Sequence, residues 1–425
     1  MTEAETADRA GVIAEWRAGW RTVVAAAFGS STGLILFSFI VSVFVRPQTE
    51  DMGWTRGEAA LSSFSTIAAG MLAPLFGKLS DAWGVRPVIL LGGIGYAAAA
   101  FGLSVQNGNL PLYYGLMFLL VFLGLGTSSI TWGRVVSAGF RKSRGLALSV
   151  ALSSVTVTAA LMPIAIVMVM GQAGWRGAWV LIGVVGLAGS LLGLLLMPKE
   201  TGRSQPRAAE TAVQQKGAGL GEAVRQPAFW CLVLGMTIIN IPSGGIMSSM
   251  AAIVADKGFG ETDVAQVLSA FAISVFLGRA ITGVCLDRFA PPIVAFVAMG
   301  VPAIGCALLA GGPVIVGVML FGIVLAGLSQ GAEGDVGPFL VSRYFGLASF
   351  GAIMGAVNAG VVGGTGLGGL LFGFVFDSYK SYDMALWIGA GCFLFGALLF
   401  LGVGFAPARK ETAPEGSGAA NQIGF

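Results

Sequence analysis

A single arginine lies inside an otherwise apolar stretch and is the most informative residue of the chain. Arg279 precedes Asp287, at the end of that stretch, by eight residues. In a helix this separation places it ~12 Å from a membrane interface, near the middle of the bilayer. A guanidinium at this depth costs at least a few kcal/mol, so it should face a cavity or a partner. Its planar fork can hold a carboxylate through two hydrogen bonds, which makes Arg279 a candidate substrate anchor.

Two acidic residues in a later apolar stretch are candidates for proton coupling. Glu333 and Asp335 lie eight to ten residues before Arg343, at a depth comparable with that of Arg279. Burial and a neighbouring arginine change the proton affinity of a carboxyl group in opposite directions, so its protonation can depend on substrate. The alternative is structural: an ion pair with Arg279, or a gate network with Arg343 and Asp287. Gate or loop structure is also the interpretation of the charged residues Asp81 and Arg86.

Uncharged polar residues within apolar stretches are further candidates for substrate contacts. Asn240 lies beside Pro242, Ser31 occupies the matching position in the first apolar stretch, and Asn358 is the only amide between residues 350 and 376. Trp132 could form part of a cavity wall. The alternative for each residue is a contact between helices.

Other kinds of chemistry find little support in the sequence. The chain has no histidine, and its four cysteines lie inside or at the ends of apolar stretches without CxxC spacing. We find no nucleophile–base set and no phosphate-binding loop. We therefore expect no metal, no cofactor and no enzymatic activity.

The elements that position these residues are membrane-spanning helices. Of 425 residues, 56% are hydrophobic and only 11% are charged, too few charges to cover a soluble domain of this size. Apolar stretches of about 20 residues recur along the chain, the length required to cross a bilayer as helix. The 66 glycines favour close packing between such helices. This pattern predicts an all-α membrane protein with twelve transmembrane helices in two six-helix bundles.

The apolar stretches and polar breaks predict five regions: an N-terminal segment, two bundles, a linker and a tail. The predicted helices cover 20–45, 57–80, 86–106, 110–138, 144–170, 175–197, 226–255, 263–286, 290–310, 313–342, 348–376 and 382–405. The regions are 1–19, 20–197, 198–225, 226–406 and 407–425.

The basic residues predict the orientation. With a cytoplasmic N-terminus, 18 of the 24 lysines and arginines lie on the cytoplasmic side and five on the outer side, with Arg279 between them. This asymmetry follows the positive-inside rule. Residues 1–19, the linker and the tail should therefore all be cytoplasmic.

An internal repeat relates the two halves. Gly77-Lys-Leu-Ser-Asp81 ends the second predicted helix, and Gly283-Val-Cys-Leu-Asp287 ends the eighth, 206 residues later. Two such halves side by side enclose a cavity at mid-membrane, and rocking one against the other gives alternating access.

The segment Gly77-Lys-Leu-Ser-Asp81-Ala-Trp-Gly84-Val-Arg86 resembles the loop signature of the major facilitator superfamily. A narrower resemblance is to its monocarboxylate and oxalate carriers. It rests on residues 124–126 with 139–148, on residues 331–346, and on Gly278-Arg279. Two departures place the chain nearer the bacterial monocarboxylate type. Val275 replaces the aspartate that animal monocarboxylate carriers usually have. The lysine that oxalate carriers have on the eleventh helix is missing, since no lysine lies between residues 351 and 376.

The resemblance implies a monomeric, multi-pass carrier in a bacterial inner membrane. We expect proton-coupled symport of a monocarboxylate such as lactate or pyruvate, with a small carboxylate, a proton and the lipid bilayer as partners and no nucleic acid. A dicarboxylate exchanger of the oxalate type, and a drug or sugar carrier of the same fold, are the alternatives.

Overall fold

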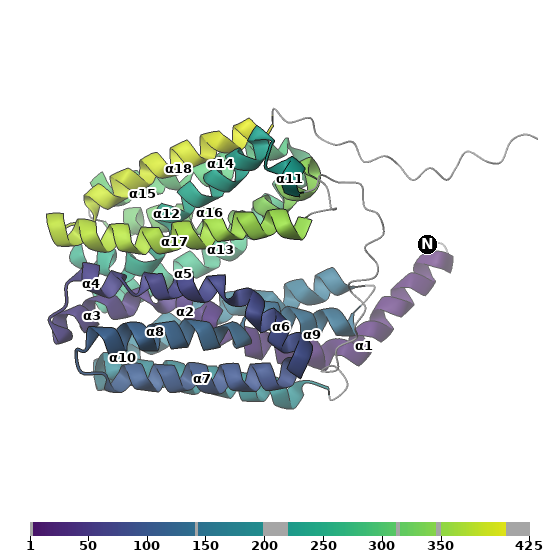
Figure 1. Cartoon of the computed structure of the whole chain (residues 1–425), viewed down its shortest axis with the longest axis horizontal. Coiled ribbons are helices and arrows are strands. Elements are labelled where there is room, and N and C mark those ends of the chain that lie inside the picture. The colour runs from purple at the N-terminus through teal and green to yellow at the C-terminus, as the bar shows by residue number, and fades with distance from the viewer. Residues whose placement is uncertain (1–2, 141–142, 199–219, 312–314, 346–349, 405–425) are drawn as a thin grey trace, which may run out of the picture.

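The computed structural model describes residues 3–140, 143–198, 220–311, 315–345 and 350–404, and within these ranges the chain is helical and without strands. Figure 1 shows two groups of roughly parallel helices, one from each half of the chain, lying against each other. The first group comprises α1 to α10, and the second comprises α11 to α18. The predicted division into two bundles is therefore confirmed in outline.

The first two crossings of the N-terminal half are built from broken helices. The first consists of α1 (Glu3–Ser31), α2 (Leu34–Ile40) and α3 (Ser42–Met52), and the second of α4 (Arg56–Ala60), α5 (Ser63–Met71) and α6 (Ala73–Trp83). The break after α1 bends the chain by 41°. Gly33 lies at this break, where a Cβ atom would overlap the Thr127 hydroxyl.

The other four crossings of this half are α7 (Val85–Val105), α8 (Leu110–Gly124) continued by η1 (Leu125–Thr127) and α9 (Ser129–Gly139), and the two arms of α10 (Arg144–Leu196). The arms of α10 meet at Gly174, whose φ of 65° and ψ of −174° are not helical. Glycine adopts a positive φ without the steric cost that a side chain adds. Helix α10 therefore contains two membrane crossings.

The C-terminal half consists mainly of long helices. After the short α11 (Leu220–Ala223), the six crossings are α12 (Pro227–Asp256), α13 (Glu261–Arg288), α14 (Pro291–Gly300) with α15 (Pro302–Gly311), α16 (Val316–Tyr344), α17 (Phe350–Tyr379) and α18 (Asp383–Val403).

Length and composition support the membrane assignment. Within the described residues, nine helices are long and apolar enough to cross a bilayer, and the bent pair of α1 and α2 adds a tenth span. One of the nine contains the break at Gly174, and α4 to α6 are individually too short to be counted. Large apolar side chains also cover the outer surface, where Met71, Val105 and Leu195 are 76%, 78% and 80% exposed.

Two helix boundaries differ most from those predicted. Helix α1 begins at Glu3, whereas the prediction began near residue 20, because helix formation continues through a polar segment that hydrophobicity alone excludes. The first crossing also runs to Met52 rather than to residue 45. Residues 199–219 of the predicted linker and 405–425 of the predicted tail lie outside the described residues.

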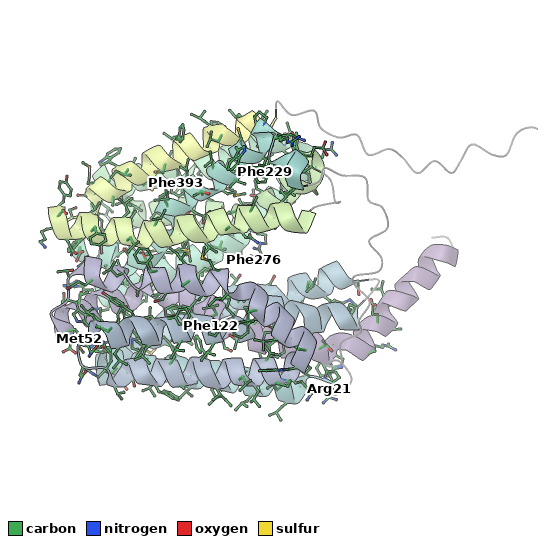
Figure 2. All side chains as sticks on the ribbon, in the orientation of Figure 1. Arg21, Met52, Phe122, Phe229, Phe276 and Phe393 are labelled. Atoms are coloured by element: carbon green, nitrogen blue, oxygen red, sulfur yellow. The ribbon has the colours of Figure 1, made fainter. Side chains whose placement is uncertain are left out.

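Glycines allow close packing within the C-terminal half. Helices α12 and α17 lie side by side, and a Cβ atom on Gly364 or Gly368 would overlap a backbone carbonyl oxygen of Thr237 or Ile241, respectively. Figure 2 shows Phe229 and Phe393 among the side chains of this half and Phe122 among those of the other. One cluster of buried apolar side chains extends through both halves, and a second lies within the N-terminal half.

Candidate functional site

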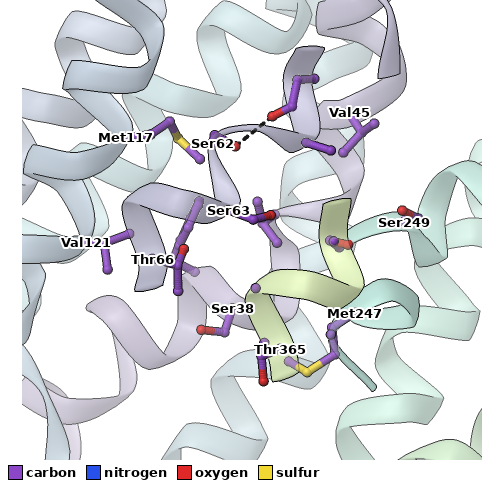
Figure 3. A pocket seen from close by; sticks show the side chains of 18 of the residues that line it. Ser38, Val45, Ser62, Ser63, Thr66, Met117, Val121, Met247, Ser249 and Thr365 are labelled. Carbon is purple, nitrogen blue, oxygen red and sulfur yellow. Dashed lines mark hydrogen bonds between the residues drawn. The ribbon is translucent and has the colours of Figure 1, made fainter. Parts of the chain in front are cut away.

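A cavity of about 280 Å³ lies between the two halves. Helices α2 to α5 and α8 line one side, and α12 and α17 line the other. The walls are mostly apolar, with hydroxyl groups between the apolar side chains (Figure 3). The hydroxyl-bearing residues that Figure 3 labels are Ser38, Ser62, Ser63, Thr66, Ser249 and Thr365.

An ion pair between the halves closes one end of the cavity, which we call the α4 end. Arg56 begins α4 and lines the cavity, and its Nη1 and Nη2 donate to the two carboxylate oxygens of Asp256 at the end of α12. The guanidinium also lies over the ring of Phe376, 3.6 Å from its centroid. The guanidinium also lies 5.2 Å from the centroid of the Tyr382 ring, and burial raises the pKa of that phenol. These contacts hold Arg56 to the opposite half.

A second carboxylate from the C-terminal half strengthens this closure. Asp377 of α17 accepts hydrogen bonds from the backbone N–H groups of Arg56, at 3.0 Å, and Gly57, at 2.6 Å. The first N–H groups of a helix have no partner within the helix, and a carboxylate is favoured there. Asp377 therefore attaches α17 to the first turn of α4.

Glycines on one face of α17 permit the contact. Gly366, Gly369 and Gly373 line the cavity and pack on α4 and α5. A Cβ atom on Gly373 would lie 2.5 Å from that of Ala60. Between described side chains, no hydrogen bond or ion pair joins the halves at the opposite end. Among the described residues, the polar contacts between the halves therefore lie at the α4 end. The one exception is a hydrogen bond that the Ser269 hydroxyl of α13 donates to the Ala160 carbonyl oxygen of α10.

Arg279 lies on α13 beside α16. Its Nε is 3.8 Å from Oδ1 of Asp335, and its side chain is 57% exposed. That separation exceeds a hydrogen bond, so the pair is electrostatic and loose. The missing side chain of Gly334 leaves room for the guanidinium. The ion pair that we considered as the structural alternative for these residues is therefore present as a loose contact with Asp335, and it leaves the donors of the arginine largely uncommitted.

The predicted residues Asn240 and Glu333 lie in one hydrogen-bonded network. Asn240 Nδ2 donates to Glu333 Oε1 at 2.9 Å, and Gln330 Nε2 donates to Glu333 Oε2 at 3.1 Å. Thr365, which lines the cavity, donates through Oγ1 to Asn240 Oδ1 at 3.2 Å. These hydrogen bonds between residues of α12, α16 and α17 thus connect the cavity wall to the half-buried carboxyl group of Glu333.

The remaining predicted substrate contacts are scattered. Asn358 is exposed on α17, one turn before the cavity-lining Val362. Ser31 is buried, and its hydroxyl donates to the Phe28 carbonyl at 3.4 Å. Trp132 is fully buried in the core of the N-terminal half, against Gly29 and Gly193, and does not line the cavity.

The two predicted gate residues whose side chains the structure describes lie apart from the cavity. Arg86 donates through Nη2 to the Met197 carbonyl at 2.6 Å and so ties the start of α7 to the end of α10. Arg343 is exposed in the last turn of α16. The side chains of Asp81 and Asp287 lie outside the described residues.

Sequence reasoning missed the closure at the α4 end. It counted Arg56 only as an orientation signal and did not consider Asp256 or Asp377. One available signal was the spacing of Thr55 and Glu58, which form a capping box at the start of α4. That pattern places Arg56 at a helix start, although it does not identify the partner in the other half.

Two six-helix halves around a central cavity, with broken crossings and polar groups in the interior, define the class of membrane transporters. The sequence comparison identifies the family. The Major Facilitator Superfamily matches residues 22–332 and 232–423, and this chain belongs to it. The resemblance seen in the loop signature is therefore confirmed.

Similar proteins include transporters of several kinds. Human monocarboxylate transporter 11 is 26% identical over 91% of this chain and 83% of its own length. YhjX, an uncharacterized MFS-type transporter of Escherichia coli, is 24% identical over 70% of this chain and 74% of its own. The crystal structure of a mutant of the nucleoside transporter NupG has a TM-score of 0.77 at 12% identity, covering 90% of this chain and 99% of NupG. This structural likeness concerns the fold alone.

Proposed function

We propose that this transporter carries a small monocarboxylate together with a proton by alternating access. The observation that supports it is Arg279, a cation in the membrane-spanning body with a 57% exposed side chain and one loose acidic partner at 3.8 Å. A guanidinium in lipid is costly, which favours an aqueous path beside it. Its uncommitted donors suit a carboxylate, and the similarity to monocarboxylate transporter 11 agrees with this substrate class.

The same proposal assigns the coupled proton to Glu333 or Asp335. Both lie on α16, and the first is hydrogen-bonded to Asn240 while the second faces Arg279. An anion that occupies Arg279 weakens the support that this cation gives to ionised Asp335. Substrate binding then favours proton binding, as symport requires.

We further propose that the α4 end faces outward, because most basic residues then lie on the cytoplasmic side. The contacts of Arg56 with Asp256 and Asp377 then form an outer gate, and the structure corresponds to an inward-facing state. Closure of the opposite end would complete the transport cycle.

A dicarboxylate exchanger is less well supported. A dianion favours two uncommitted cations. Among the described side chains that line the cavity, Arg56 is the one cation, and Asp256 already occupies both of its terminal nitrogens. Arg279 would then bind one carboxylate without a second cation for the other.

Uptake by proteoliposomes tests the proposed function. We expect labelled lactate or pyruvate to accumulate when the outside is acidic, and Arg279→Gln and Arg279→Lys to lose most of this uptake. The matched control is Arg46→Gln, which removes an exposed arginine paired with Glu50 at the surface. Unchanged uptake by Arg279→Gln would remove the anchor role. Uptake that ignores the proton gradient would remove the symport assignment.

A further inference from the structure

The wall of the cavity near the α4 end contains an uncommitted amide. Gln48 of α3 is 2% exposed and lines the cavity. Its Nε2 has no hydrogen-bond partner among the described residues. A buried N–H donor without a partner costs about 1 to 3 kcal/mol. A donor kept in this state beside a cavity indicates a site for a ligand that supplies an acceptor.

The surroundings of Gln48 favour a neutral ligand over an anion. Arg56, the described cation of this cavity, is committed to Asp256, and Asp377 is held against the start of the same helix. One formal positive charge therefore stands against two negative ones. Phe37, Phe44 and the other apolar side chains of the wall offer a carboxylate no compensation for lost water.

A carboxylic acid in its protonated form meets these conditions. A glutamine amide can donate N–H to the carbonyl oxygen of the acid and accept its O–H through Oε1. The pair forms two hydrogen bonds without burying a net charge. A carboxylate cannot donate the second bond, and it would add a negative charge near Asp256 and Asp377.

We propose that Gln48 forms a second binding site, specific for the neutral, protonated carboxyl group of the substrate. The inference rests on the proposed function and deepens it. In this part of the path the coupled proton is on the substrate itself: one carboxylate and one proton combine into one neutral acid. The anion is held at Arg279, and the acid occupies the apolar end of the cavity.

Lactamide is a suitable probe because it is a permanently neutral analogue of lactic acid that keeps a carbonyl acceptor and an N–H donor. Its binding to the purified full-length protein can be measured by titration calorimetry. The test variant is Gln48→Leu, with Gln48→Met as a second apolar variant if the first folds poorly. The matched control is Gln106→Leu. Gln106 is also 2% exposed with an unpartnered Nε2, but it does not line the cavity.

We expect lactamide to bind the wild type and Gln106→Leu alike, with little dependence on pH, and the Gln48 variants about tenfold more weakly. Equal binding by a folded Gln48 variant, or no lactamide binding by the wild type, would overturn this site.

The proposed function is judged separately by uptake of lactate, pyruvate and oxalate by the wild type. Uptake that depends on Arg279, together with lactamide binding that ignores Gln48, would leave the carrier assignment intact and remove only the second site. Absence of uptake of all three acids would instead remove the carboxylate assignment itself.

Discussion

Arg56 and Arg279 have different surroundings, which suit them to the different roles proposed for them. Arg56 is held by Asp256, lies 3.6 Å over Phe376, and has its backbone N–H bound by Asp377. Arg279 has one acidic neighbour, 3.8 Å away, and a largely exposed side chain. A substrate carboxylate would have to displace strong contacts at Arg56 but only a weak one at Arg279. Residue type alone does not distinguish the two.

The network around Glu333 gives the first prediction. Replacing Asn240 with Leu removes the donor to Glu333 Oε1, which should destabilise the protein by about 1 to 3 kcal/mol. When Glu333 is already replaced by Leu, Asn240→Leu should lower the free energy of unfolding by less. The coupling energy between the two residues should be about 1 kcal/mol or more. A double-mutant cycle of unfolding free energies in detergent measures this. Additive effects would show that the hydrogen bond contributes nothing to stability.

Sequence reasoning at this scale identified residues but not their partners. Arg279 is conspicuous because a charge in an apolar helix requires a reason. Arg56 is not, because a cation at a helix end is common near an interface. Asn240 and Glu333 are 93 residues apart, and a single sequence contains nothing that pairs them. Gln48 lies in a polar run, Gln48-Thr-Glu-Asp51, and it is buried because α3 packs on α12 of the other half as well as on α4 and α10 of its own.

At the scale of elements, α17 is the helix on which closure depends. One face packs on α12 through Gly360, Gly364 and Gly368, and another meets α4 and α5 through Gly366, Gly369 and Gly373. The first contact lies within one half, whereas the second lies between the halves and must separate when the α4 end opens.

Gly373→Ala therefore tests the second contact. The added Cβ would lie 2.5 Å from the Cβ of Ala60 and 2.9 Å from the Arg56 carbonyl oxygen, so the α4 end should close less completely. This overlap should raise the free energy of the state that is closed at the α4 end by roughly 1 to 3 kcal/mol. We therefore expect lactate uptake to fall by about tenfold. Gly363→Ala on the same helix is the control, because its Cβ meets nothing within 4 Å. Equal uptake by the two variants would contradict the role of this face.

The number and order of the crossings followed from hydrophobicity, but their breaks did not. Residues 144–170 and 175–197 were predicted as separate helices, and Gly174 marks their junction. The breaks of the first two crossings fall within the predicted helices 20–45 and 57–80, and short polar runs such as residues 30–33 do not end a span that is predicted from its overall hydrophobicity. Gly33 occupies one of them because of a close approach to Thr127 of another crossing. Such a contact cannot be read from local sequence.

Gly174 gives a prediction that depends on backbone conformation alone. Its φ is 65°, and a Cβ atom there would meet nothing within 4 Å. Gly174→Ala should destabilise the protein by about 1 to 3 kcal/mol, because this φ together with a ψ of −174° lies in a backbone region that is almost restricted to glycine. Gly171→Ala, with equal space and no positive φ, should be neutral or slightly stabilising. Equal unfolding free energies for the two variants would show that this junction tolerates a side chain.

At the scale of the whole molecule, the described polar contacts between the halves are concentrated at the α4 end. A transporter that alternates must form and break such contacts in every cycle, so they cannot be too stable. A buried ion pair suits this requirement, because water can solvate both ions once the pair separates. The opposite end should close through residues that include Asp81, Arg86, Asp287 and Arg343, which remain predicted gate residues.

The last prediction concerns the balance between the two states. Arg56→Gln removes the ion pair with Asp256 and the stacking on Phe376, and so should favour opening at the α4 end. Opening can be measured in cells with a membrane-impermeant maleimide and Ser249→Cys. Ser249 lines the cavity and is 5% exposed.

We expect external labelling of Ser249→Cys to accelerate by about tenfold or more when Arg56→Gln is added, which corresponds to roughly 1.4 kcal/mol. Arg46→Gln, which removes a surface arginine at the same end, should leave the rate unchanged. Labelling that accelerates only when the reagent is applied from the cytoplasmic side would reverse the proposed orientation. A rate unchanged from either side would mean that the closed end is held by apolar packing along α17, and that the ion pair does not control access.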